Sequence, residues 1–472
     1  MRSVFFLILF LSVKSVFCQV TQISLSSDTI KFSILRDGHY DGQKLYQFPI
    51  QANADQSPYT MGGKDVEFVF YGDKDTVRFV HTDYPKAQAF PVKIKSPNHE
   101  ADIKVGFHSI TAELPQAYMD EVRGKVIYEI PEVFELANII LGLSNSFQGA
   151  SQNKETPYYK EVLTYFDDYS DHEIFDKLST DGLQEKEEGD QYYDFRDNSY
   201  GYTFNDSSEI VHANQYFYLN GYNRDTHENM FAELLPLIQD FANKSDFRSF
   251  FRNHRGYYDS LMATQGKLLM AESMWQWLEK EFPVLKIHTY KVVMSPIIGG
   301  SHSTQMFHQR IVEENEVFSE CMMFMNVTDR RIQDRYDSNE DLTAFISGNL
   351  FTELDHNYIN PFTRRYYNEI SSAFKDRSKW VAQDKATYYS SEHSVYQEYL
   401  TYALYSVWAR ETFSKEVADA AIAKRVELNE NRRGFYRFTE FNDMLVKLEN
   451  KHSDKTIMEL MPQIIEWCQN ID

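Results

Sequence analysis

The stretch "GNLFTELDHNYINPF", residues 348–362, decides how the rest of this chain is interpreted. Its centre reads Thr352-Glu353-Leu354-Asp355-His356, which differs from the motif H-E-x-x-H only in having a threonine at the first position. We expect this stretch to form a helix, on which side chains three or four residues apart lie on the same face. Glu353 and His356 are therefore predicted to share a face.

The chemistry of that motif depends on its spacing. Two histidines four residues apart are offset by about 40° around a helix with 3.6 residues per turn, so both imidazoles reach one zinc ion. The glutamate after the first histidine activates a water at the metal as a general base. Here Glu353 stands at the base position and His356 at the position of the second histidine. Thr352 cannot replace an imidazole as a neutral nitrogen ligand, so the predicted site lacks one ligand.

Two replacements for the missing ligand are physically possible. Glu353 and His356 are offset by about 60° around the helix, so both could bind the metal, and another group would then act as the base. Alternatively, His302 in "GGSHST" could supply the ligand from a strand beside the helix.

A further carboxylate lies in a later predicted helix, "SVYQEYLTYAL". Glu398 follows His356 by 42 residues and is surrounded in the sequence by apolar and aromatic residues. A buried carboxylate requires a partner, because an unpaired charge is costly to remove from water. Without a metal, Glu353 and His356 are ordinary helix residues and Asp355 is a surface or helix-end residue, since the pattern E-x-x-H also arises by chance.

Length and composition predict an exported globular protein. The chain has 472 residues, which favours two or three domains, and 42% of them are hydrophobic, which is enough for a packed core. Residues 1–18, "MRSVFFLILFLSVKSVFC", have an early arginine followed by an apolar core, so we interpret them as a signal peptide. Lipid attachment at Cys18 is the less favoured alternative, because Phe17 before it is large. We expect the mature chain in the periplasm or outside the cell.

Charge and cysteine content exclude other classes of protein. The formal net charge is −22, and loss of Arg2 and Lys14 with the signal peptide makes it −24. An acidic protein repels phosphate backbones, so nucleic acid is not an expected partner. Cys321 and Cys468 alone cannot form a disulfide scaffold, and no apolar run of the mature chain is long enough for a transmembrane span.

The pattern along the chain predicts two domains of different type. Residues 19–118 contain short runs typical of β-strands, with Gly72-Asp73-Lys74-Asp75 as a hairpin turn. In residues 119–472 apolar residues recur at helical spacing, and we expect a helix to start at Pro131. Within this part, "KIHTYKVVMSPIIGGSHSTQMF" and "FSECMMFMNVTD" are predicted to be two strands. The expected fold class is α+β: an antiparallel β domain followed by a mostly α-helical domain with a small sheet.

One segment and one cysteine favour structural roles. Residues 167–197 contain twelve acidic residues against three basic ones, without the alternation and central glycine of a calcium-binding loop. We interpret this segment as solvated, partly mobile surface. Cys321 lies in an apolar run, which predicts a buried structural thiol instead of a nucleophile.

An ordered series of strings supports a family resemblance. In chain order these are "IPEVFELANIILGL", "YYKEVLTYFDDYSDHEIFDKL", "VMSPIIGGSH", "LFTELDHNYINP", "EYLTYAL" and "RRGFYRFTEFNDML". They resemble a family of uncharacterised secreted bacterial proteins with a domain of unknown function, which is similar in pattern to the gluzincin-type zinc metallopeptidases. The resemblance covers roughly residues 120 to 450.

The resemblance implies a zincin-like helical domain and a zinc site. It would make Glu353 the catalytic base, His356 the second zinc ligand and Glu398 the third, with Tyr436 as a phenol that stabilises an oxyanion. The expected function is hydrolysis of peptide bonds in a peptide or protein substrate, impaired to the extent that Thr352 weakens metal binding. The alternative is a catalytically inactive zincin-fold protein that binds or scaffolds a peptide or glycan.

Overall fold

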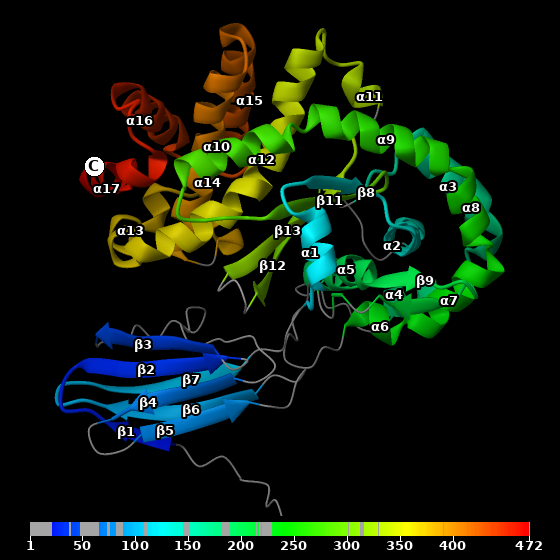
Figure 1. Ribbon diagram of the computed structural model, residues 1–472. Helices are drawn as coiled ribbons and strands as arrows, with labels where there is room; N and C mark the ends of the chain where they lie inside the picture. The colour runs from blue at the N-terminus through cyan, green and yellow to red at the C-terminus, as the bar shows by residue number, and fades with distance from the viewer. Residues whose placement is uncertain are drawn as a thin grey trace, which may run out of the picture. The chain divides into compact units, whose positions relative to one another are not determined.

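The computed structural model describes residues 21–36, 39–47, 66–72, 76–81, 88–107, 112–144, 152–180, 188–213, 215–216, 219, 229–300, 302–311, 316–328, 330–389 and 391–471. These residues divide into two compact units, with the boundary between Thr111 and Ala112. Strands make up the first unit and all the described helices belong to the second, so the fold class is α+β as predicted (Figure 1). The predicted signal peptide, including Cys18, lies outside the described residues.

The first unit contains two β-sheets. Its strands are β1 (Thr21–Ser24), β2 (Thr29–Arg36), β3 (His39–Gln47), β4 (Val66–Tyr71), β5 (Thr76–His81), β6 (Gln88–Lys95) and β7 (Glu100–Phe107). One sheet has the strand order β3-β2-β4-β5 and is antiparallel throughout. The antiparallel pairing of β4 with β5 confirms the predicted hairpin, although residues 73–75 of its turn lie outside the described residues.

The second sheet of this unit departs from the antiparallel prediction. Its order is β1-β6-β7, and β1 pairs with β6 in the parallel direction. These two strands are far apart in the sequence, so no tight turn dictates their relative direction. In the first sheet, Phe32 stacks on Phe68 at a centroid distance of 4.9 Å, and Phe68 meets Phe70 edge-on at 4.6 Å. These rings build an apolar centre for a unit whose strands are short.

A four-stranded sheet lies at the centre of the second unit. Its strands are β8 (Val126–Glu129), β11 (Thr289–Ser295), β12 (Ser303–Ile311) and β13 (Glu316–Asn326), and a separate pair is formed by β9 (Tyr202–Phe204) and β10 (Ile210–His212). The order is β12-β13-β11-β8, with β8, β11 and β13 parallel and β12 antiparallel at the edge. The prediction of two strands was therefore wrong. The run after residue 286 contains two strands, β11 and β12, separated by the turn after Ser295, and β8 was not predicted.

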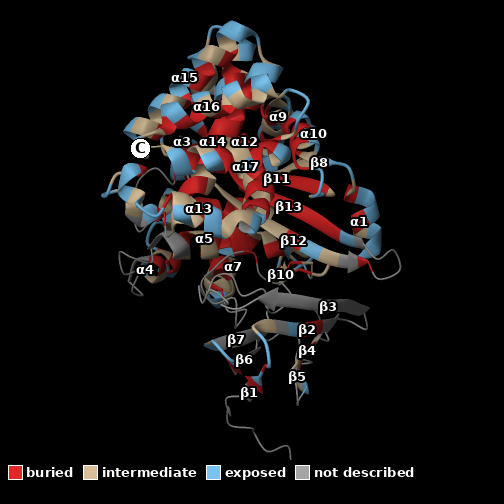
Figure 2. Ribbon diagram, turned by 90° about the vertical axis from the view of Figure 1, so that its left-hand side faces the viewer, coloured by how far each residue is buried: buried red, intermediate tan, exposed pale blue. Residues whose placement is uncertain are grey.

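Both faces of this sheet are covered. All seven residues of β11 are buried, and Figure 2 shows β11 and β13 as buried ribbons. Tyr290, Val292 and Met294 face one cluster of apolar side chains, which includes the helix predicted from residues 348–362. Val293 faces a second cluster on the opposite side. A strand that is buried on both faces lacks the alternation of apolar and polar residues that marks a half-buried strand.

Helices surround this sheet. They are α1 (Gln116–Val122), α2 (Glu132–Leu143), α3 (Pro157–Phe166), α4 (Glu173–Thr180), α5 (Glu188–Asn198), α6 (Met230–Glu233), α7 (Leu235–Lys244), α8 (Phe247–Asn253), α9 (Arg255–Leu268), α10 (Ala271–Glu281), α11 (Arg330–Gln333), α12 (Asn339–Thr363), α13 (Tyr367–Ala373), α14 (Glu392–Thr412), α15 (Lys415–Asn431), α16 (Phe438–Lys451) and α17 (Ile457–Asn470). Pro131 is the residue that caps α2, which confirms the predicted start of that helix. None of the described helices is long and apolar enough to cross a membrane.

Helix α12 contains residues 348–362, the stretch with Glu353 and His356. Ser338 caps it, because its hydroxyl accepts a hydrogen bond from the backbone N–H of Asp341 at 3.0 Å. The helix packs against α14, α10, α15 and the edge strand β12. A hydrogen bond of 3.0 Å between the phenols of Tyr290 and Tyr358 ties it to β11. These contacts fix α12 between the sheet and the C-terminal helices.

Part of the acidic segment is buried, contrary to the prediction of a solvated surface. Arg196 and Asp197 at the end of α5 have no exposed surface, and the Arg196 Nε donates a hydrogen bond to Asp197 at 2.7 Å. The guanidinium also lies over the rings of Tyr192, Tyr193 and Phe324. Ion pairing and aromatic stacking together compensate its removal from water, which a count of charges does not reveal.

Candidate functional site

The predicted site residues meet where α12 packs against α14. The Nε2 of His356 on α12 lies 3.5 Å from the Oε1 of Glu398 on α14. Glu353, one turn before His356, is close enough to both for their charges to act on its carboxyl group. The structure thus places all three predicted residues in one region, with His356 and Glu398 in contact.

Two sets of neighbouring contacts fix the register of these helices. Phe351 packs against Tyr405 and Trp408 of α14, with ring centroids 5.9 and 5.4 Å away. One turn further along α12, the Nδ1 of His356 lies 3.4 Å from the hydroxyl of Thr401. Because Thr401 engages one ring nitrogen, the other nitrogen is directed to Glu398. Thr401 is a positioning residue that the sequence did not single out.

The edge strand β12 adjoins the same part of α12. The side-chain amide of Asn357 donates to the hydroxyl of Thr304 on β12 at 3.4 Å and to the backbone carbonyl of Glu353 at 2.8 Å. The sequence hypothesis of a strand beside the motif helix is consistent with this contact. An edge strand has backbone groups without a strand partner on one side, which an extended peptide can use.

Burial and charge act in opposite directions on Glu353. Loss of water raises the pKa of its carboxyl, while the nearby His356, Arg433 and Arg196 lower it and Glu398 raises it again. The net result is a pKa above the ordinary value of a glutamate. A carboxyl that exchanges its proton closer to neutral pH is suited to acid–base chemistry.

Asp355 is buried, which corrects its interpretation as a surface or helix-end residue. It has no exposed surface, and neither carboxylate oxygen has a hydrogen-bond partner among the described residues. Burial, together with the charges of Glu398 and Glu353, holds its pKa well above the usual range. Burial therefore disfavours the charged form of this carboxyl.

Thr352, at the position of the missing ligand, is engaged within its own helix. Its side chain is buried, and its hydroxyl donates to the backbone carbonyl of Asn349 at 2.9 Å. This bond is the usual one for a threonine inside a helix. Thr352 therefore has a local role that needs no metal.

Two arginines after the site were not predicted. The Nη1 of Arg433 lies 3.7 Å from the Oε2 of Glu398, and its guanidinium stands 4.4 Å above the ring of Tyr402. Arg425 is buried in α15 and donates to the side chain of Asn349 at 2.8 Å and to the carbonyl of Phe345 at 3.2 Å. For Arg433 the only sequence signal was the string "RRGF", which gives no spacing relative to Glu398.

The other residues considered from the sequence fall elsewhere. The Nε2 of His302 is buried without a partner among the described residues, and burial together with Arg196 and Arg425 lowers its pKa to about 4, so its imidazole is neutral. Tyr436 is 61% exposed, and among the described residues no hydrogen bond or ion pair joins its phenol to Glu398 or His356. Cys321 is fully buried, and burial raises its pKa to about 12, which confirms a structural thiol.

The side chains of Glu353, His356 and Glu398 are of the types that bind a divalent metal, but they are not arranged as three ligands around one point. An imidazole and two carboxylates lie in one partly buried region, and the two oxygens of Asp355 beside them have no hydrogen-bond partner among the described residues. These are donors that zinc accepts. Yet no three His, Cys, Asp or Glu side chains in the described ranges come close enough together to hold a metal ion. His356 and Glu398 are the pair that would hold it.

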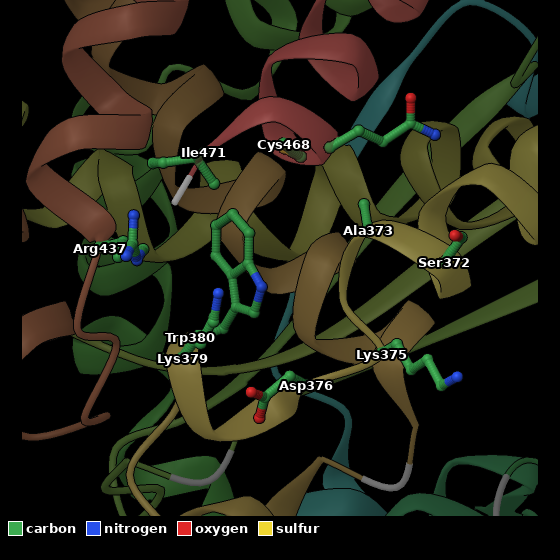
Figure 3. Close-up of a pocket in the computed structure, with 10 residues that line it drawn as sticks. Ser372, Ala373, Lys375, Asp376, Lys379, Trp380, Arg437, Cys468 and Ile471 are labelled. Atoms are coloured by element: carbon green, nitrogen blue, oxygen red, sulfur yellow. The ribbon is translucent and has the colours of Figure 1, made fainter.

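A pocket opens next to this pair. Its volume is about 490 Å³, and its lining includes Glu398 and Arg433. A larger pocket of about 630 Å³ lies at Trp380 and Arg437 and includes none of the predicted site residues (Figure 3). We take the smaller pocket as part of the candidate site, because it shares a carboxylate with the His356–Glu398 pair.

Comparison with known proteins adds no further assignment. No family model, no curated protein and no solved structure matches this chain.

Proposed function

We propose that this chain is an exported zincin-like hydrolase that cleaves peptide bonds at the site formed by Glu353, His356 and Glu398. The observation that carries the proposal is the distance of 3.5 Å between His356 Nε2 and Glu398 Oε1. The motif and its order in the sequence predicted this meeting of residues that lie 42 positions apart. Helix α12 beside an edge strand adds support, because such a strand can hold an extended substrate.

In the proposed site each residue has a separate task. His356 and Glu398 would hold the metal, and Thr401 orients the imidazole of His356. Glu353 would take a proton from the attacking water and pass it to the leaving amine. A bound zinc ion supplies a Lewis acid for the carbonyl oxygen and lowers the pKa of a water molecule.

The cation of Arg433 balances the charge of this site. It lies 3.7 Å from the second oxygen of Glu398, and it lowers the pKa of Glu353. Arg196 acts on Glu353 in the same direction. Both arginines therefore favour the ionised form in which Glu353 can accept a proton.

Hydrolysis of internally quenched peptides tests the proposal. The mature chain with one equivalent of zinc is incubated with a mixed library of such peptides, and product formation is followed by fluorescence and mass spectrometry. We expect cleavage by the native chain and a loss of at least about 100-fold in Glu353→Gln, since a general base contributes roughly 10²- to 10⁴-fold. Glu430→Gln, which changes a half-buried glutamate that accepts a hydrogen bond from the backbone N–H of Thr439, should keep the native rate. A rate that is equal in Glu353→Gln and in the native chain contradicts the proposal.

A second candidate function is metal-free binding of a peptide by the same site. Glu398 already has two partners, His356 and Arg433, and the hydroxyl of Thr352 is satisfied within its helix. A site whose charges are balanced without a metal can bind a ligand without cleaving it. The absence of hydrolysis and of zinc binding, together with retained binding of a peptide, would favour this candidate.

A further inference from the structure

The pocket beside Glu398 carries a positive charge within an acidic protein. Its lining consists of Lys385, Tyr388, Tyr389, Ser394, Glu398, Arg432 and Arg433. These residues provide three cationic side chains and one carboxylate, whereas the whole chain has a net charge of −22. The volume of about 490 Å³ lies within the range of about 300–1,000 Å³ that is usual for pockets that bind small ligands.

The single carboxylate of the pocket is already neutralised. Oε1 of Glu398 lies 3.5 Å from His356 and Oε2 lies 3.7 Å from Arg433. The Nε of Arg433 is buried and has no hydrogen-bond partner among the described residues. Arg432 has no ion pair within the described part of the chain, and Lys385 has only a long contact of 3.7 Å to the exposed carboxylate of Asp384. The pocket therefore keeps the cations of Arg432 and Lys385 for a ligand, beside the guanidinium of Arg433, which Glu398 and the phenol of Tyr389 already contact.

The backbone of this region brings the cations together. Arg432 caps α15, and Gly434 follows in the left-handed region with φ of +71°. A Cβ at Gly434 would lie 2.7 Å from the Cβ of Ala382, so glycine allows the chain to pass close to that residue. The N–H of Ala382 donates to the carbonyl of Gly434 at 2.9 Å, which holds the loop with Lys385 next to Arg432 and Arg433.

We infer that this pocket binds the free C-terminal carboxylate of a peptide. Guanidinium groups form paired hydrogen bonds with a carboxylate, and a lysine adds a point charge. The exposed ring of Tyr388 supplies apolar surface for the terminal side chain, and the buried ring of Tyr389 forms part of the pocket wall. Because Glu398 belongs to both the pocket and the candidate site, the last peptide bonds of the ligand then lie beside His356 and Glu353.

This inference rests on the proposed function and names the substrate class of that site. A peptide anchored by its C-terminal carboxylate is cut near its C-terminus, so the chain is an exopeptidase acting on short or unfolded peptides. An endopeptidase would need no such anchor, since its substrates extend in both directions from the site.

Binding of two matched peptides tests the inference without turnover. The probes are dansyl-Gly-Phe-Ala with a free carboxylate and the same peptide with a C-terminal amide, and binding is followed by fluorescence anisotropy in the presence of a chelator. We expect the free acid to bind at least about tenfold more tightly than the amide. Arg433→Gln should reduce this ratio to less than twofold. Arg432→Gln, at an exposed position, should reduce it in part.

A matched control separates the pocket from general charge. Arg410→Gln removes the same charge at the end of α14, where Arg410 is exposed and contacts Asp419 at 3.3 Å, and it should keep the native ratio. Equal affinity of the native chain for the two peptides, including no detectable binding of either at millimolar concentration, overturns the inference. An unchanged ratio in both Arg432→Gln and Arg433→Gln overturns it as well.

The peptidase proposal and the carboxylate pocket can be tested separately. If the chain discriminates the free acid from the amide but hydrolyses neither, the carboxylate pocket stands and the peptidase proposal falls. If it hydrolyses both peptides with the same efficiency, the peptidase proposal stands and the carboxylate pocket falls.

Discussion

The imidazole of His356 lies 3.5 Å from the carboxylate of Glu398, although the two residues belong to different helices. Both groups lose part of their water between α12 and α14, so their contact replaces part of the solvation that each has lost. The second oxygen of Glu398 lies 3.7 Å from Arg433, which extends the pair into a pocket. The same carboxylate thus links a prospective metal ligand to a prospective substrate anchor.

Thr352→His tests whether the first ligand position is the missing part of the site. The substitution places an imidazole four residues before His356, which is the spacing that two zinc-binding histidines need. We expect affinity for zinc to rise at least about tenfold in isothermal titration, with a stability loss of about 1–3 kcal/mol from overpacking a buried position. Thr439→His, at an exposed position, should leave the affinity unchanged. A lower affinity in Thr352→His would mean that Glu353 already completes the native site.

The rate of hydrolysis should depend on pH through Glu353. Its pKa is raised above the ordinary 4.5, so the rise of kcat/KM with pH occurs at higher pH than for an exposed glutamate. Arg433 lowers that pKa, so its removal in Arg433→Gln favours the protonated form and moves the rise to still higher pH. The measurement is kcat/KM against pH with an amidated peptide, which does not use the carboxylate pocket. An unshifted profile in Arg433→Gln contradicts the assignment of Glu353 as the base.

The missing side chain of Gly348 in α12 leaves space for the guanidinium of Arg425. A Cβ at Gly348 would lie 2.4 Å from Nη2 of Arg425, whose guanidinium is buried and bonded to Asn349. We expect Gly348→Ala to destabilise the protein by about 1–3 kcal/mol in urea unfolding, because the guanidinium has little room to move. Gly256→Ala is the matched control, since nothing lies within 4 Å of its Cβ and alanine favours a helix by up to about 1 kcal/mol. Equal effects of the two substitutions would contradict this close packing.

Glu135 should make stability depend on pH. It is fully buried on α2, and burial raises its pKa to about 8, while the phenol of Tyr158 donates to it at 2.7 Å. Between about pH 4.5 and 8 the unfolded chain ionises this residue while the folded chain keeps the proton, so stability falls as the pH rises, by up to about 5 kcal/mol. Glu135→Gln removes this contribution, and the free energies of unfolding of the two proteins should diverge across that range. Parallel curves contradict it.

The parts of the site that could be predicted are those with a local or ordered signal. The helical spacing after Pro131 and the motif around Glu353 and His356 are local patterns, and Glu398 lies in the next strongly apolar helix. The buried state of Asp355 and the contacts of Arg433 depend on the packing of α14 and the loop after α15, which no spacing encodes.

The boundary between β11 and β12 and the burial of Arg196 were predicted wrongly for other reasons. The strands β11 and β12 are separated by Pro296 and the pair Gly299-Gly300, which are turn signals inside the stretch that was predicted as one strand. Arg196 stands among acidic residues that suggested solvent exposure, but its stacking on aromatic rings allows burial. The burial of Arg196 depends on which elements lie side by side, because Phe324 beneath it belongs to β13.

Titration of zinc into the purified mature chain tests the site most directly. The native chain, His356→Ala and Glu398→Ala are stripped with a chelator and dialysed, and zinc uptake is measured by isothermal titration and by mass spectrometry under native conditions. One zinc ion per native chain, with a loss of at least about 100-fold in affinity in both variants, is the expected result, because each variant removes one of the two ligands. No uptake by the native chain, or the same uptake by all three proteins, would contradict a metal site at His356 and Glu398.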